Sequence, residues 1–136
     1  MSKRLTIKDG LSYPVEEYIV TLSDITLWFD IINDEMFSNG LDKFMKIDIC
    51  EELGDDDGPF WAAAGCWVYN DTQLPMGSTL EIVTVFPCFQ MFLCTLAHEM
   101  VHLFQWQELG ISDHGPTFEA WSETFLKCGL PLDEIM

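Results

Sequence analysis

The sequence predicts an α+β fold, in which an N-terminal helix, a small three-stranded sheet and two further helices form one domain over residues 1–136. Three observations predict it. Apolar residues recur at helical spacing over residues 23–39, three segments between 44 and 86 have the composition of strands, and an almost wholly apolar stretch begins at residue 88. Because strands and helices are grouped rather than alternating, we expect a mostly antiparallel sheet.

The first helix is expected over residues 23–39, with Ser23 or Asp24 as its N-cap and Gly40 as its stop. Residues 1–21 have no clear pattern. The apolar positions that define the helix are Leu27, Trp28, Ile31, Ile32 and Met36.

Three strands are expected next, over residues 44–50, 60–70 and 78–86. The first alternates apolar and polar side chains, which is typical of a half-buried strand. The second is rich in small residues. We expect the third, 78–86, to form the edge of the sheet, where a substrate segment could pair with its backbone.

Residues 88–109 are apolar nearly all round, so they predict a central, buried helix that ends at Gly110. Pro116 suits the first turn of a last helix, which Gly129 and Pro131 would end. The apolar face of that helix is formed by Phe118, Trp121 and Phe125.

The charge of the chain disfavours one class of partner. The chain has a formal net charge of −17, and no lysine or arginine lies between residues 47 and 126. Nucleic-acid-binding surfaces need clustered cations, so direct binding of nucleic acid is disfavoured. Negative charge keeps a protein soluble and attracts basic molecules, which favours a basic protein or peptide as partner.

We expect a cytoplasmic protein without a membrane segment. No run of 18 or more uncharged apolar residues is present, and the N-terminus lacks the apolar core of a secretory signal. The five cysteines are scattered and form no C-x-x-C pair, which is typical of reduced thiols.

The stretch "AHEMVHL", residues 97–103, contains candidate metal-binding and catalytic residues. On a helix, His98 and His102 lie about 40° apart on one face, and Glu99 lies about 60° from His102 at the rim of that face. Two neutral imidazoles suit zinc, and a neighbouring carboxylate can take a proton from a water that zinc activates. The pattern H-E-x-x-H on a helix is the signature of zinc metallopeptidases, with Glu99 as catalytic base.

A catalytic zinc site needs a third protein ligand. His114, the last of the three histidines in the chain, is the favoured candidate, and Glu119 and Glu123 on the next helix are alternatives. The metzincin pattern requires glycine and a ligand where this chain has Gln105 and Glu108, so that class does not fit.

The stretch "AHEMVHLFQWQELGISDHGPTFEAW" resembles the SprT-like zinc metallopeptidase domain, which is related to the Spartan proteases. The shared features are HExxH, a loop that ends in H-G-P-x-F and a following amphipathic helix. The similarity extends upstream through "WFDIINDEMFSNGLDKFMKIDI", "FWAAAGCWVYN" and "TLEI", and covers about residues 23–128. The sequence has no C-x-x-C pairs of the C-terminal zinc ribbon that many relatives carry.

The resemblance implies a zincin-like fold, one zinc ion bound by His98, His102 and His114, and Glu99 as the catalytic residue. It also implies proteolysis, which in the best-known relatives is directed at proteins crosslinked to DNA. Two other functions remain open: a zinc-stabilised acidic binding protein or nucleic-acid mimic without activity, and a three-histidine metal-dependent nuclease. With all histidines on zinc, the oxyanion would be stabilised by zinc, a backbone N–H or a tyrosine such as Tyr69.

Overall fold

The computed structural model describes residues 5–56, 58–68, 75–109 and 115–130. As expected, helices and small sheets are combined in one mixed structure. The first helices and strands along the chain are α1 (Ile7–Leu11), β1 (Tyr18–Ile19), α2 (Leu22–Phe37), β2 (Lys46–Cys50), β3 (Gly54–Asp55) and β4 (Gly58–Pro59). They are followed by β5 (Ala62–Val68), β6 (Pro75–Val83), β7 (Val85–Phe86), α3 (Phe89–Phe104), the π-helical turn η1 (Gln105–Leu109), α4 (Pro116–Glu119) and α5 (Ser122–Lys127).

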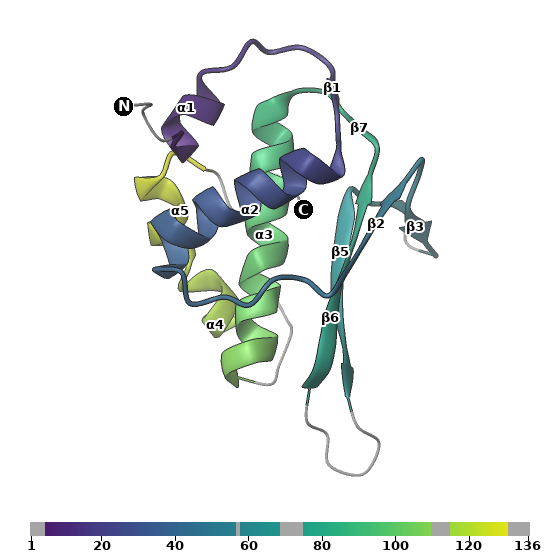
Figure 1. The fold of residues 1–136 in the computed structure, drawn as a ribbon, viewed down its shortest axis with the longest axis vertical. Coiled ribbons are helices and arrows are strands. Elements are labelled where there is room, and N and C mark those ends of the chain that lie inside the picture. The colour runs from purple at the N-terminus through teal and green to yellow at the C-terminus, as the bar shows by residue number, and fades with distance from the viewer. Residues whose placement is uncertain (1–4, 57, 69–74, 110–114, 131–136) are drawn as a thin grey trace.

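Helix α3 runs through the middle of the molecule, with α1 and α2 on one side and the sheet on the other (Figure 1). Its buried residues run almost without interruption from Phe92 to Leu103, as the sequence predicts for a central helix. A helix that is apolar all round has no face suited to water, so it is stable only when other elements cover every side.

The main sheet has three strands in the order β2-β6-β5. Strand β5 pairs with β6 in antiparallel fashion, but β2 pairs with β6 in parallel, with Lys46 opposite Thr79. The sheet is therefore mixed rather than mostly antiparallel. Strand β5 runs opposite to β2, and the chain then reverses again into β6. Strand β6 therefore lies between them and runs in the same direction as β2.

The expectation that residues 78–86 form the sheet edge is wrong. Strand β6 is the central strand, and residues 85 and 86 belong to the separate strand β7, which pairs with β1. Leu80 and Ile82 of β6 are fully buried while Glu81 between them is exposed. This alternation reports one covered face and says nothing about the number of neighbouring strands.

Helix α2 begins one residue before the expected start, because Thr21 rather than Ser23 or Asp24 is its N-cap. The Thr21 side chain accepts a hydrogen bond from the backbone N–H of Asp24. The helix ends at Phe37, before Gly40, and the next two residues, Ser38 and Asn39, have left-handed φ values of 52° and 61°. The backbone turns there without a glycine, and the side chain of Asn39 bonds Asp34.

The N-terminal segment, in which no periodic pattern is evident, packs closely on the central helix. Helix α1 has a capping box in which Thr6 and Asp9 satisfy each other's backbone N–H groups. A Cβ at Gly10 would lie 2.7 Å from the side chain of Leu93 and 2.9 Å from that of Trp28, so glycine permits this close approach.

Strand β1 is fixed to the core through Tyr18. Its ring packs against Phe89 and Phe92 of α3, and its hydroxyl donates a hydrogen bond to the carboxylate of Asp24. Burial, and next the hydrogen bond to Asp24, raise the pKa of Tyr18.

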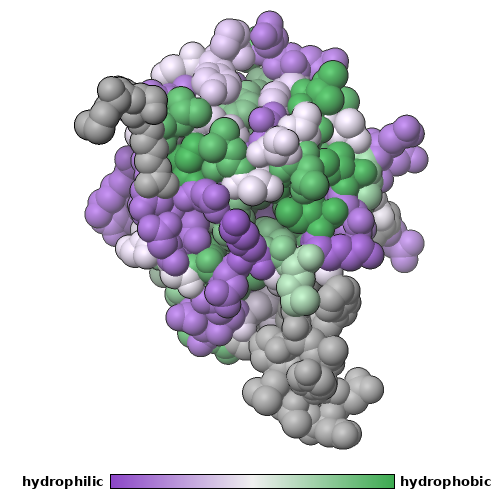
Figure 2. Space-filling model, viewed as in Figure 1, coloured by the Kyte–Doolittle hydropathy of each residue, from purple (hydrophilic) through white to green (hydrophobic). Residues whose placement is uncertain are grey.

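The surface carries apolar and polar patches. Figure 2 shows hydrophobic and hydrophilic residues gathered in separate areas on one face of the molecule. Ile19 and Val85, which face each other across the β1–β7 pair, and Leu22 at the start of α2 are exposed. Among the described residues, no helix is long and apolar enough to cross a membrane.

Asn33 supplies the connection between α2 and the segment that leads into β2. Its buried side chain donates to the carbonyl of Leu41 at 3.0 Å and accepts from the N–H of Leu41 at 3.1 Å. Replacement by alanine would leave both backbone groups without their partner. We expect Asn33→Ala to lower the free energy of unfolding by about 2–3 kcal/mol, measured by urea denaturation.

Thr26→Ala is the matched control, because Thr26 lies on the same helix and its exposed hydroxyl bonds only the carbonyl of Leu22 among the described residues. It should change the free energy of unfolding by no more than about 0.5 kcal/mol. Equal losses for the two variants would contradict a structural role for the Asn33–Leu41 contact.

Candidate metal centre

His98 and His102 lie one turn apart on the buried part of α3, and their imidazoles are close together in an edge-on arrangement. The ring centroids are 5.1 Å apart and the ring planes are inclined at 75°. The side chains are almost wholly buried, with 1% and 7% of their surface exposed. The structure thus brings together the two residues that the sequence predicts as metal ligands.

A phenylalanine from another helix covers this pair. Phe118 of α4 stacks on His102, with centroids 5.0 Å apart and planes inclined at 24°. The same ring meets the edge of His98 at 4.7 Å. Phe118 is only 3% exposed, so α4 shields the imidazoles from solvent. Pro116 begins α4, as the sequence predicts.

Gln105 is a partner that sequence reasoning did not identify. It begins the π-helical turn, is fully buried, and its Oε1 lies 2.9 Å from Nδ1 of His102. Its Nε2 donates to the hydroxyl of Thr117 at 3.0 Å. The signal was present in the spacing, because residues three apart on a helix are neighbours. In the sequence, Gln105 stands out only because it occupies the place of the metzincin glycine.

Two further polar residues of α3 belong to the same face by helix geometry. Glu99 is 5% exposed and follows His98 directly. Thr95 lies one turn earlier, about 60° around the helix from His98 and about 40° from Glu99. Its buried hydroxyl has no hydrogen-bond partner among the described residues. The helix face thus carries a hydroxyl, a carboxylate and two imidazoles in an otherwise apolar setting.

The third predicted ligand, His114, lies outside the described residues, as does Tyr69. The alternatives to His114 can be placed. Glu119 is exposed, and Glu123 is exposed and paired with Lys127 at 3.9 Å. Within the described part of the chain, no three His, Cys, Asp or Glu side chains form a group that could hold a metal. Glu119 and Glu123 are thus exposed, whereas the two imidazoles are buried.

The residues present fit zinc as far as they are described. Neutral imidazole is a preferred zinc ligand, and the buried carboxylate of Glu99 lies beside the pair on the same helix. Burial of such polar groups is costly unless they are partnered, and Gln105 supplies a partner for His102.

Comparison with known proteins gives no further support. No family model, curated protein or solved structure matches the chain. The resemblance to the SprT-like domain stays a prediction that depends on the motif residues themselves.

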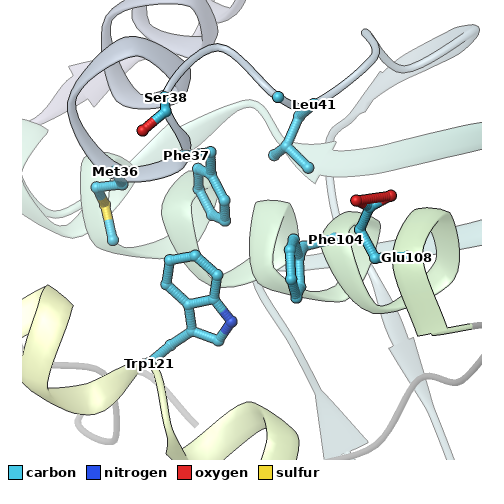
Figure 3. A pocket seen from close by; sticks show the side chains of 8 residues that line it. Met36, Phe37, Ser38, Leu41, Phe104, Glu108 and Trp121 are labelled. Atoms are coloured by element: carbon cyan, nitrogen blue, oxygen red, sulfur yellow. The ribbon is translucent and has the colours of Figure 1, made fainter.

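A surface pocket of about 250 Å³ lies between the end of α2, the π-helical turn and Trp121 (Figure 3). Phe37, Phe104 and Trp121 form its aromatic wall, with Glu108 at the side. Phe104 follows His102 by two residues, which is about 200° around α3. The pocket and the imidazoles therefore lie on opposite sides of the helix, and the pocket is not part of the candidate metal centre.

The packing of Phe118 can be tested through stability. We expect Phe118→Ala to lower the free energy of unfolding by about 3–5 kcal/mol, because a fully buried ring is lost and a cavity opens beside the imidazoles. Leu126→Ala is the control, since Leu126 is 71% exposed and should contribute less than about 0.5 kcal/mol. Coincident urea transitions for the two variants would show that α4 does not cover the histidines in solution.

Proposed function

We propose that the protein is a zinc-dependent metalloendopeptidase of the SprT-like type. The observation that carries this proposal is the buried pair His98 and His102, with their rings 5.1 Å apart and Glu99 next to them on α3. A purely apolar helix would be more stable without these groups, so their joint burial favours a shared chemical purpose.

His98, His102 and His114 would hold the zinc ion. When bound there, zinc would supply the Lewis acidity that makes a water molecule acidic and polarises the scissile carbonyl. The carboxylate of Glu99 accepts the proton of the attacking water and then passes it to the leaving amine. Phe118 and the buried surroundings of α3 exclude bulk water, which strengthens the electrostatic interactions of Glu99.

A peptide in extended form is the substrate that the sheet suits best. Strand β5 packs against α3 and, among the described strands, pairs on one side with β6 alone. Its other edge can accept an added strand through backbone hydrogen bonds, which tolerate many sequences. The net charge of −17 favours basic proteins over nucleic acid as the molecules attracted to the site.

Glu99→Gln tests the catalytic role. The amide keeps the size of the side chain but cannot accept the proton, so we expect peptide hydrolysis to fall at least about 100-fold while zinc content stays unchanged. The measurement is cleavage of casein and of histones, with and without DNA, beside metal analysis of the same samples.

Glu108→Gln is the matched control. Glu108 is exposed on the π-helical turn, away from the imidazoles, so its substitution should leave the cleavage rate within about twofold. A wild-type protein that binds zinc but cleaves neither substrate would contradict the peptidase and favour the acidic, zinc-stabilised binding protein.

Metal analysis tests the ligand set. We expect wild-type protein to bind one zinc ion per chain, and His98→Ala, His102→Ala and His114→Ala to lose it. Glu119→Ala and Glu123→Ala should keep a full zinc complement, since both carboxylates are exposed. Zinc retained by His114→Ala but lost by either glutamate variant would assign the third ligand to the last helices.

A further inference from the structure

Three polar side chains form a continuous chain from α3 to α4. His102, Gln105 and Thr117 are joined by contacts of 2.9 and 3.0 Å. The first two side chains are buried, and Gln105 has no exposed surface at all. The contact between His102 and Gln105 joins two buried groups, so it has little competition from water, whereas the bond to Thr117 reaches an exposed residue.

We propose that Gln105 is a positioning residue, which holds His102 in the tautomer that presents Nε2 to the metal. This inference deepens the proposed function and rests on it for the identity of the metal. Gln105 touches neither the substrate nor the ion in this scheme, and acts through His102.

The direction of the hydrogen bonds carries the inference. The amide of Gln105 has two chemically different ends, and its NH₂ group donates to the hydroxyl of Thr117. The carbonyl end faces Nδ1 of His102 at 2.9 Å, and a carbonyl oxygen can only accept. Nδ1 of His102 must then carry the hydrogen, which leaves the lone pair on Nε2.

Metal-bound histidines in proteins commonly donate their other ring N–H to a carbonyl or carboxylate, and this contact fixes the ring and raises its basicity. Gln105 supplies such an acceptor from within the protein. Because the position is closed to solvent, water cannot readily replace the amide when it is removed.

The π-helical turn explains how Gln105 is kept in place. Such turns are rare and frequently occur at functional sites. On the same turn, Gln107 accepts from the N–H of Asp42 at 2.8 Å and donates to the carbonyl of Gly40 at 2.7 Å. Gln107 thus links the turn to the segment after α2, and Gln105 links it to His102 and α4.

The two glutamines provide a matched pair for measuring zinc affinity by competition with a chelator. We expect Gln105→Leu to weaken zinc binding about 10- to 100-fold, the usual effect of losing the group that orients a ligand. Gln107→Leu removes two hydrogen bonds from the same turn and should leave zinc affinity within about threefold. Gln105→Glu keeps an acceptor and should bind zinc more tightly than Gln105→Leu.

A second measurement does not depend on zinc. In the metal-free protein, the nitrogen chemical shifts of the imidazole report which ring nitrogen of His102 carries the hydrogen. We expect the Nδ1–H tautomer in the wild type and in Gln107→Leu, and a mixture of tautomers in Gln105→Leu. Thr117→Val removes the hydroxyl that contacts the amide of Gln105. It should also shift His102 towards a mixture of tautomers, with little effect on folding.

The outcomes separate this inference from the proposed function. Equal zinc affinities for wild type and folded Gln105→Leu, or an Nε2–H tautomer in the wild type, would overturn the role of Gln105 and leave the peptidase untouched. A wild type that shows the Nδ1–H tautomer but binds no zinc would instead overturn the metal centre and retain the orienting contact.

Discussion

The burial of imidazole and carboxylate groups on an apolar helix is the constraint on which the site depends. Helix α3 passes through the core, and His98, Glu99 and His102 are buried there together with its leucines. Polar groups in such a place lower stability unless each has a partner. The surroundings of the pair reflect this need, because Phe118 covers both rings and Gln105 supplies a hydrogen-bond acceptor.

Other helices and strands cover the remaining sides of α3, which explains why the last helices lie over the histidines. One side meets β5, and other sides meet α1 and α2. The side opposite the imidazoles packs Phe104 against Phe37 and Trp121, beside the pocket. Helix α4 and Trp121, the residue that caps α5, therefore contribute to two surfaces. Phe118 lies over the site and Trp121 lies on the far side, with one turn of chain between them.

The sequence predicted the site best where the residues involved are close together along the chain. The spacing of His98 and His102 places them on one face of any α-helix, so their pairing could be predicted without the rest of the fold. The contact of Gln105 with Thr117 could not, because it depends on a π-helical turn and on the place where α4 docks. The same limit applies to the sheet: the alternation around Leu80 shows a covered face but cannot reveal that β6 lies between two strands. Helix α1 is too short for its periodicity to be detected.

The parallel pairing of β2 with β6 has a consequence for the order of folding. Lys46 is paired with Thr79, and β5 joins the opposite edge of β6 through a hairpin. A hairpin closes a short loop, whereas docking of β2 must close a much longer one and so costs more chain entropy. The β5–β6 hairpin should therefore assemble early and serve as the template on which β2, with α2 attached, is laid down late.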